Sequence, residues 1–381
     1  MQTPFYRHSL IPENSDLIKK VLESPFLTSG PIGKEVEVQL CEYFDVSHAK
    51  LVNSWTNGAV ATLIALEIGP GDEVIVPAMT FIATANVVEL VGAKPVFIDC
   101  DQDTLLITPE LIRNAITSKT KAIIPVHMYG QMCDVKAIRE IIPKGQKISI
   151  IEDCAHSFEA KFNGDRPGKH SDVAIFSFYA TKNVTCGEGG AVITKNDILY
   201  ERITQSILHG MSAGASDRFK EGSYKHWEMD HLGTKANLPD LLACFLPEQI
   251  KSVDQRLGER EEIAQKYETA LRETKIKFPK VLQGMQHSRH LFPISIGFGK
   301  RDLALLMLGE AKIGATVNYR AVHTMNYYSK KYGYSGNDFP ISFSWGNETL
   351  SIPLFPGITL QEQNYVIETL LNKVDKIIGE D

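Results

Sequence analysis

VAIFSFYATKNVTCGEGGAVIT, residues 173–194, holds two short apolar runs, VAIFSF and GAVIT, on either side of a polar segment that contains two glycines. Short runs rich in Val, Ile and Phe are typical of strands. Similar runs, separated by helix-like stretches, precede it at 73–77 (EVIVP), 95–98 (PVFI), 122–127 (AIIPVH) and 148–152 (ISIIE). The alternation predicts an α/β fold with a mostly parallel sheet. Because most runs are apolar on both faces, we expect helices on both sides of that sheet.

The chain after residue 246 has a different pattern. From Pro247 to about Glu273 the apolar residues fall at helical spacing, which predicts one long helix. The later segments HLFPISIGF, Asp302–Lys312 and Leu360–Ile378 fit a smaller α+β domain. With 381 residues the chain is longer than a single core usually supports. We therefore expect a large domain over residues 1–246 and a small domain over 247–381.

The composition is that of an ordinary soluble globular protein, with 43% apolar residues, 23% charged residues and a net charge of −6. It indicates neither a nucleic acid nor a membrane partner. The start, MQTPFYRHSLIPENSD, lacks the pattern of a signal peptide. The six cysteines are scattered without a CxxC pair, so we expect no zinc site or disulfide framework. Reduced thiols in a cytoplasmic protein are the expectation.

Polar residues follow two of the predicted strands, where ligands bind in open α/β sheets. Asp153 comes directly after ISIIE, and Ser177 and Lys182 follow VAIF. Taken singly, Asp153 is better explained as a helix cap or a surface carboxylate, and Lys182 as a solvated surface side chain. A lysine five residues after a strand-end serine, followed by a glycine cluster that admits close approach of a ligand, is unusual for a packed core.

A third group, Thr56 and Asn57 in the turn NSWTNGA (53–59), opens a predicted helix. The free N–H groups of a helix N-terminus can bind a phosphate. Taken alone the turn is a weak signal, and a plain helix cap by Ser54 or Thr56 is the favoured explanation of the same residues.

SFYATKNVTCGEGG (177–190), preceded by IIEDCAHS (150–157), resembles the signature of the DegT/DnrJ/EryC1/StrS family of sugar aminotransferases. The likeness extends over nearly the whole chain, through FLTSGP (26–31), GPGDEVIVPAMTFIATAN (69–86), TKAIIPVHMYGQMCDV (120–135), LHG (208–210), NLPD (237–240) and YRAVHT (319–324). KNVTCGEGG, NLPDLLA, YRAVHT and LSIPLFP are closer to the branch that aminates C4 of the sugar, including the aminoarabinose-forming enzymes.

The resemblance implies the fold-type I aminotransferase architecture, a homodimer with composite active sites, and pyridoxal 5'-phosphate (PLP) as cofactor. Lys182 would hold PLP as a Schiff base, and Asp153 would pair with the pyridine nitrogen. The other cofactor contacts that the resemblance implies are the phosphate ligands Ser177, Thr56 and Asn57, a stacked ring at Phe81, and His156 beside the cofactor ring.

One segment departs from the family pattern. Where many members carry GYNYRM, this chain has GTKANL at 233–238, so Lys235 occupies the position of an asparagine that commonly reaches the neighbouring subunit's phosphate. A lysine can serve a phosphate as a point charge. Asn237 is the other candidate for this contact. Trp55 also replaces the small residue usual in the phosphate-binding turn.

The implied reaction transfers an amino group from an amino acid, glutamate, to C4 of a nucleotide-linked 4-keto sugar, for amino-sugar or surface-polysaccharide synthesis. Candidate substrate contacts are Thr28, His209, Arg320, His323 and the long segment 211–235. For Arg320, a salt bridge across the domain junction is an equal alternative.

Two other functions stay open: amination at C3 of a 3-keto sugar, and a non-catalytic protein that binds PLP or a sugar nucleotide. Related dehydratases carry histidine at the position of Lys182, which counts against dehydration. These motifs specify neither the nucleotide nor the sugar.

Overall fold

The computed structural model describes residues 1–8, 10, 15–212 and 226–378. Its largest element is a seven-stranded sheet of order β1-β8-β7-β5-β4-β2-β3. The strands are β1 (His48–Val52), β2 (Glu73–Pro77), β3 (Lys94–Ile98), β4 (Thr120–Ile123), β5 (Ser149–Asp153), β7 (Val173–Ser177) and β8 (Gly190–Thr194). Neighbours from β7 to β3 are parallel, and β8 is antiparallel to both β7 and β1. The predicted mostly parallel sheet is confirmed.

One strand is shorter than its apolar run predicts. The run AIIPVH extends to His127, but β4 ends at Ile123. Pro125 has no N–H to donate to a neighbouring strand, so the ladder stops before it. Pairing with β5 resumes only as an isolated bridge between Val126 and Asp153. This break directs the residues after Pro125 along the carboxyl end of β5.

Helices cover both faces of the sheet, as predicted. On β7, Val173 and Ile175 belong to one hydrophobic core, while Ala174 and Phe176 belong to another on the opposite face. The first face is covered by α3 (Trp55–Ala65), α4 (Ala83–Leu90) and α7 (Asp197–Ser206). The second face is covered by α2 (Pro31–Phe44), α8 (Asp240–Ala243), α5 (Pro109–Ala115) and α6 (Val135–Glu140).

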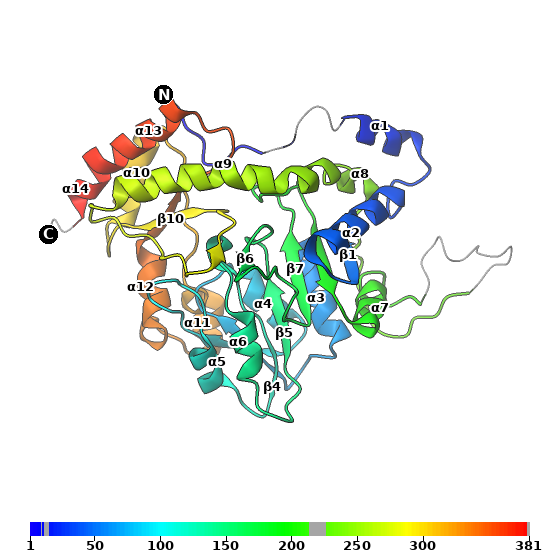
Figure 1. Ribbon diagram of the computed structural model, residues 1–381. Helices are drawn as coiled ribbons and strands as arrows, with labels where there is room; N and C mark the ends of the chain where they lie inside the picture. The colour runs from blue at the N-terminus through cyan, green and yellow to red at the C-terminus, as the bar shows by residue number, and fades with distance from the viewer. Residues whose placement is uncertain (9, 11–14, 213–225, 379–381) are drawn as a thin grey trace.

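The long predicted helix is α9 (Pro247–Leu271), which runs along the upper side of the molecule in Figure 1. All six apolar residues that define its period are buried: Ile250, Val253, Leu257, Ile263, Tyr267 and Leu271. Its first half packs with α2 against the large sheet, and its second half belongs to a separate core. One helix therefore connects the two cores.

The separate core is built on two antiparallel strands, β10 (Phe292–Ser295) and β11 (Thr349–Ile352). The helices that pack on it are α10 (Arg301–Glu310), α13 (Leu360–Thr369) and α14 (Asp375–Ile377). The predicted last helix is interrupted, because residues 370–374 form a π-helical turn between α13 and α14. This α+β arrangement agrees with the predicted fold class. The boundary at residue 246 stays a prediction.

Part of the C-terminal chain returns to the large sheet. It carries α11 (Asn326–Tyr332) and α12 (Pro340–Glu348), whose residues Tyr328 and Trp345 pack on two cores of the large sheet. The remaining elements are α1 (Ser15–Glu23) and the short antiparallel pair β6 (Lys161–Phe162) and β9 (Met285–Gln286). Among the residues that the structure describes, no helix combines the length and apolar character needed to cross a membrane.

Candidate active site

A cleft of about 600 Å³ lies at the carboxyl ends of β5 and β7, where the large sheet meets the C-terminal part of the chain. The sheet contributes the start of α3 and the residues that follow β2, β5 and β7. The C-terminal part contributes residues 290–291, 316 and 318–319. This is the place where open α/β sheets bind ligands. Of the predicted site residues, the cleft is lined by Thr56, Phe81, Asp153, His156, Ser177 and Lys182.

Lys182 projects into this cleft from the segment after β7. Burial lowers the pKa of its amine from 10.5 to about 8, and the nearby carboxylate of Asp153 partly opposes this shift. Its Nζ lies 3.5 Å from Nε2 of His290. A pKa near neutrality gives the amine a sizeable neutral fraction, and the neutral amine is the nucleophilic form.

Asp153 is the last residue of β5, and its side chain is buried. Oδ2 accepts a hydrogen bond from the Thr84 hydroxyl at 2.9 Å, and Oδ1 accepts one from the backbone N–H of Ala155 at 3.1 Å. Burial raises the pKa of Asp153, while these two hydrogen bonds and the charge of Lys182 lower it. The result is a carboxylate of fixed orientation, whose charged form a cation placed in the cleft would stabilise.

The start of α3 shows both features that its sequence allows. Ser54 caps the helix and accepts a hydrogen bond from the backbone N–H of Asn57 at 3.1 Å. The Asn57 side chain donates to Asn53 at 2.9 Å. Asn57 therefore already uses the N–H that was expected to bind phosphate, and it does not line the cleft. Thr56 lines the cleft, as does Ser177, whose hydroxyl accepts from the N–H of Tyr179 at 3.3 Å.

Aromatic and imidazole rings form one wall of the cleft. The Phe81 side chain is 51% exposed, and its ring lies 5.4 Å from that of Tyr319. His156 is buried, and its Nδ1 accepts the backbone N–H of Tyr129 at 3.2 Å. The proton of the neutral ring is therefore on Nε2, which donates to the Tyr319 hydroxyl at 3.1 Å. Burial lowers the pKa of His156 well below its usual value, so the ring stays neutral.

The loops around Thr28 and Lys235 meet outside the cleft. The Asn237 amide donates to Thr28 Oγ1 at 3.1 Å and to Ser29 Oγ at 2.9 Å. Lys235 donates to the side-chain oxygen of Asn237. Thr28, Ser29 and Lys235 are exposed, and none of these four residues lines the cleft. The structure brings these family-like segments together on the surface, away from Lys182 of the same chain.

Arg320 and His209, two of the remaining substrate candidates, both lie at the surface. Arg320 is exposed and forms no ion pair within the described ranges, so the alternative of a salt bridge across the junction is wrong for that part of the chain. His209 is also exposed, and its N–H donates to the backbone of Thr234. Of the segment 211–235, residues 213–225 lie outside the described residues.

His323 corrects an expectation. Its side chain is fully buried, and its ring packs edge-on against Phe339 with 4.9 Å between centroids. It does not line the cleft. The 3-10 turn over Val322–Thr324 holds its side chain in the core, away from the substrate contact that was expected of it.

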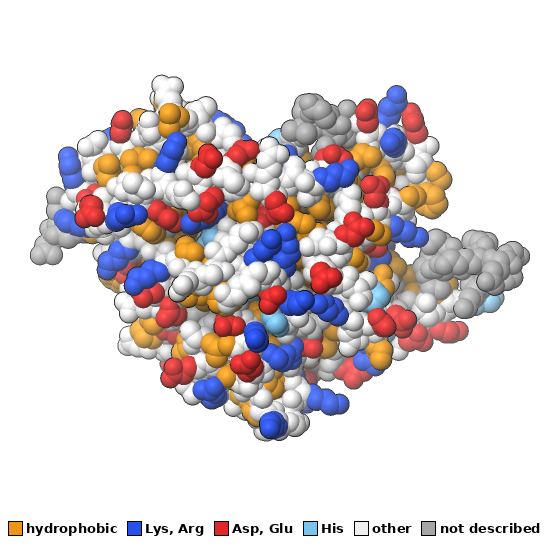
Figure 2. Space-filling view, viewed as in Figure 1, with side chains coloured by type: hydrophobic (Ala, Val, Ile, Leu, Met, Phe, Trp, Pro, Cys, Tyr) orange, Lys and Arg blue, Asp and Glu red, His pale blue; other side chains and the backbone are white. Residues whose placement is uncertain are grey.

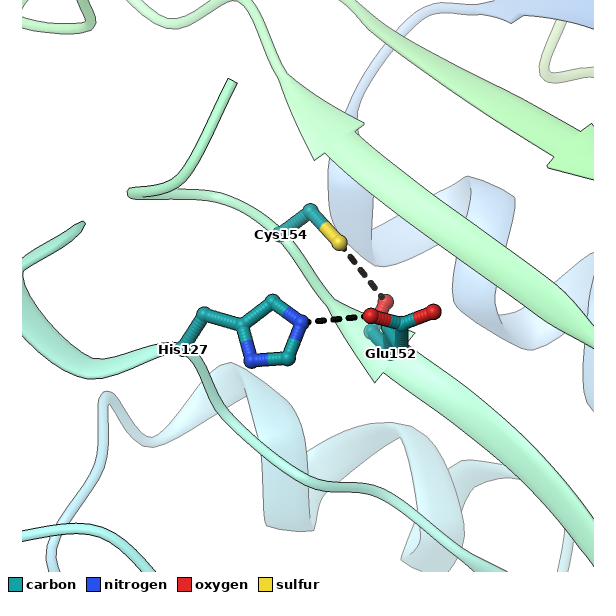
Figure 3. A group of neighbouring side chains, drawn as sticks. All are labelled: His127, Glu152 and Cys154. Carbon is teal, nitrogen blue, oxygen red and sulfur yellow. Dashed lines mark hydrogen bonds and ion pairs between the residues drawn. The ribbon is translucent and has the colours of Figure 1, made fainter. Parts of the chain in front are cut away.

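A second buried cluster is structural. Figure 3 shows His127, Glu152 and Cys154 side by side, close enough for their side chains to share a metal ion. The Glu152 carboxylate instead accepts hydrogen bonds from His127 Nε2 at 2.6 Å, from the Gly168 N–H at 2.7 Å and from Ser171. His127 Nδ1 accepts the N–H of Cys133. The protein thus satisfies the atoms that a metal would need, and the cluster fixes β5 behind Asp153.

His290 is one of several cleft residues that the sequence analysis missed, along with Thr84 and Tyr319. It belongs to HLFPISIGF, which the sequence analysis assigned only to the small α+β domain, and it lies two residues before the start of β10. Its ring lies 4.5 Å from that of His156, and its Nε2 faces the Lys182 amine. A single buried histidine before an apolar run carries no signal that distinguishes it from a core residue.

Known proteins share this architecture. The profile of the DegT/DnrJ/EryC1/StrS aminotransferase family matches residues 9–371. A protein of Streptococcus pneumoniae described as a sugar aminotransferase, Spr1654, has a TM-score of 0.91 in its PMP form, with 29% identity over 99% of this chain and 100% of that chain. The same protein has also been solved in its PLP form.

DesV of S. venezuelae, in complex with a ketimine intermediate, has a TM-score of 0.89 and 30% identity over 99% of each chain. An aminotransferase from Psychrobacter cryohalolentis has a TM-score of 0.89 and 26% identity over 99% of this chain and 100% of that chain. The large parallel sheet with its smaller α+β part is thus the fold-type I architecture of PLP-dependent aminotransferases. The chain belongs to the DegT/DnrJ/EryC1/StrS family of PLP-dependent sugar aminotransferases.

Proposed function

We propose that this protein transfers an amino group from glutamate to C4 of a nucleotide-linked 4-keto sugar, with PLP held in the 600 Å³ cleft. The observation that supports this reaction class most strongly is that one cleft contains both the Lys182 amine and the Asp153 carboxylate. Bound PLP supplies the electron sink that amino-group transfer requires. A protein that only stored the cofactor would have no need of an amine whose pKa burial has lowered to about 8.

The residues of the cleft fit PLP in charge and shape. Asp153 is a buried carboxylate that lacks a full counter-charge, which suits a protonated pyridine nitrogen. Phe81 offers an exposed ring face on which the cofactor ring can stack. Ser177 and the α3 N-terminus at Thr56 offer a hydroxyl and a favourable helix dipole to the phosphate.

Lys182 would have two tasks. It would anchor the cofactor covalently, and once its amine is free it would move a proton to or from the reacting carbon. General acid–base catalysis is most effective when the pKa lies near the working pH, and a value of about 8 meets this condition. Because donor and sugar nucleotide would occupy the same Lys182 site in turn, ping-pong kinetics are expected.

We also propose a homodimer in which each cleft is completed by its partner. Thr28, Ser29 and Lys235 are exposed, and their cluster with Asn237 lies outside the Lys182 cleft of its own chain, as expected if it reaches the partner's cofactor phosphate. Figure 2 shows hydrophobic side chains at the surface near α1. Leu22, Phe26 and Leu27 are exposed in this region, and a C2 interface would bury them.

The choice of C4 rests on the resemblance of four sequence segments. The expected grip on the substrate is electrostatic: the exposed guanidinium of Arg320 can bind a phosphate or a carboxylate in bidentate fashion. Such a group suits a site that accepts an amino acid and a sugar nucleotide alternately. Thr28 and His209 are further candidates at the surface.

The test is to incubate the purified enzyme with glutamate and a panel of 3-keto and 4-keto sugar nucleotides, and to identify the products by NMR. Lys182→Ala serves as the control that removes the reacting amine. Amination only at C3 would contradict the C4 assignment. A Schiff base with PLP gives visible absorbance that borohydride treatment removes. If the PLP-loaded protein shows no such band, the non-catalytic alternative is favoured.

A further inference from the structure

His290 occupies a position that the proposed reaction does not yet use. Its Nε2 lies 3.5 Å from the Nζ of Lys182, at the outer limit of a hydrogen bond. On its other side, Nδ1 lies 3.3 Å from Oδ1 of Asn183. The histidine is 6% exposed and thus lies almost wholly inside the protein, between the lysine and its sequence neighbour.

The orientation of the Asn183 amide is fixed by what surrounds it. Its Nδ2 is 3.0 Å from Oε2 of Glu159 and 3.0 Å from the backbone oxygen of Ser288. A carboxylate and a carbonyl can only accept, so the group between them must be the amide nitrogen with its two protons. The amide oxygen therefore faces His290.

This orientation fixes the tautomer of His290. An amide oxygen only accepts, so the Nδ1 that faces it must carry the ring proton. Burial lowers the pKa of His290 well below its usual value, with further contributions from nearby cations, so the ring is neutral. The Nε2 of a neutral ring protonated at Nδ1 has only its lone pair, and that lone pair faces the Lys182 amine.

The network has a rigid base. Glu159 is fully buried and forms an ion pair with Arg260, which is 2% exposed. Arg260 comes from α9, and its Nε donates to the same Ser288 oxygen that accepts from Asn183. A chain of contacts therefore runs from α9 to the Lys182 amine, through Arg260, Glu159, Asn183 and His290 in that order.

We propose that His290 is a positioning residue for Lys182: through Nε2 it accepts a hydrogen bond from the Lys182 amine and directs that amine toward the reacting carbon. The inference rests on the proposed function, in which Lys182 is freed and then moves a proton. A free lysine side chain has many rotamers, and ordering it lowers its entropy. A fixed acceptor keeps the amine in one place after its bond to the cofactor breaks.

The same contact affects the protonation of the amine. An acceptor at Nε2 stabilises the ammonium form, so it opposes the effect of burial on the pKa. The other titratable groups around the pair are the carboxylate of Asp153, which faces Lys182, and His156, His287 and Arg260, which lie near His290. Replacing the neutral His290 removes the acceptor of the Lys182 amine without changing the net charge, whereas replacing Asp153 or Arg260 would remove a charge.

The test measures the pKa of the Lys182 amine directly. The full-length protein, freed of cofactor by dialysis against hydroxylamine, is labelled with acetic anhydride across a pH series, and the Lys182 peptide is quantified by mass spectrometry. We expect His290→Leu to lower the labelling midpoint by about half to one pH unit, since a hydrogen bond to the charged form is lost. His290→Gln, whose amide oxygen can accept from Lys182, should recover most of the shift.

His287→Leu is the matched control. His287 lies on the same loop, but its Nδ1 accepts the N–H of Arg289 at 2.9 Å and makes no contact with Lys182. An unchanged midpoint in His290→Leu, or an equal shift in His287→Leu, would overturn the inference. In the holoenzyme, His290→Leu should lower kcat more than it changes KM for the keto sugar.

The two proposals fail in different ways. If Lys182→Ala still transfers amino groups, the proposed function is wrong, whatever the labelling shows. If Lys182→Ala is inactive and the labelling midpoint does not depend on His290, only the present inference is wrong. Circular dichroism of each variant separates loss of this contact from loss of folding.

Discussion

Asp153→Asn removes one charge from the cleft and leaves the size of the side chain almost unchanged. The backbone N–H of Ala155 can only donate, so the amide oxygen of the new asparagine must take the place of Oδ1. Its NH₂ group then faces the Thr84 hydroxyl. That hydroxyl lies 2.9 Å from the hydroxyl of Thr80, so it can rotate to donate there and accept from the amide. We therefore expect a loss of stability of no more than ~1 kcal/mol.

The effect on the reaction should be far larger. The interaction that would be lost is the proposed one between the buried Asp153 carboxylate and a protonated ring nitrogen of the cofactor. Two unit charges about 4 Å apart interact by ~4 kcal/mol at an effective dielectric constant of about 20. If the chemical step loses this stabilisation, its rate falls by roughly three powers of ten, since each 1.36 kcal/mol corresponds to a factor of ten.

The assay is the half-reaction with glutamate, followed by stopped-flow absorbance of the bound cofactor in wild type and in Asp153→Asn. Asp134→Asn serves as the control: it also neutralises a carboxylate that accepts a backbone N–H, but at the start of α6. Asp153→Asn should keep its bound cofactor and its melting temperature while the rate of the half-reaction falls; Asp134→Asn should keep all three. A rate within tenfold of wild type, with cofactor bound, would refute the pairing of Asp153 with the ring nitrogen.

Four further predictions concern the same machinery. Lys182→Ala should fold and lose all turnover, measured by circular dichroism and product NMR; more than trace activity would contradict the central role of Lys182. Only the neutral Lys182 amine attacks PLP, and its pKa is lowered to about 8, so the rate at which cofactor-free protein captures PLP should rise with pH around pH 8. A rise centred near the usual pKa of lysine would show that the pKa is not lowered. Glu159→Gln leaves the buried Arg260 unpaired and should lower the free energy of unfolding, measured by urea denaturation, by ~3–5 kcal/mol. The double variant Glu159→Gln/Arg260→Met should lose less. Sedimentation should show a dimer, and a fully active monomer would remove the composite-site proposal.

The sequence predicted the sheet well because the strands of a doubly covered sheet are apolar on both faces. VAIFS and GAVIT became β7 and β8 within one residue of the predicted bounds. The same rule overestimated AIIPVH, since it counts apolar residues and ignores that Pro125 ends the ladder. The π-helical turn within the last helix had no local signal, because the periodicity of the residues around it continues.

The predicted cofactor residues and the missed ones differ in how far apart they lie along the chain. Asp153 and Ser177 end the adjacent strands β5 and β7, and Lys182 follows β7, so a parallel sheet brings them to one edge. His290 reaches the same place from more than a hundred residues away, by a path through the second core that no periodicity encodes. His323 shows the converse error: it lies three residues after the exposed Arg320 in sequence, but one 3-10 turn places it in the core.

This difference explains why the substrate is harder to predict than the cofactor. The cofactor end of the cleft is built by strand ends, whose positions follow from the sheet, and by His156 and His290, whose tautomers are fixed in opposite senses by backbone and amide partners. His156 presents N–H at Nε2 and His290 presents a lone pair there, so one donates to Tyr319 while the other accepts from Lys182. The candidate substrate residues Arg320 and His209 instead lie exposed on surface segments and do not line the cleft. Groups fixed by packing, such as Asp153 and Lys182, support an assignment of the reaction. An exposed group such as Arg320 supports only the inference that the substrate carries a negative charge.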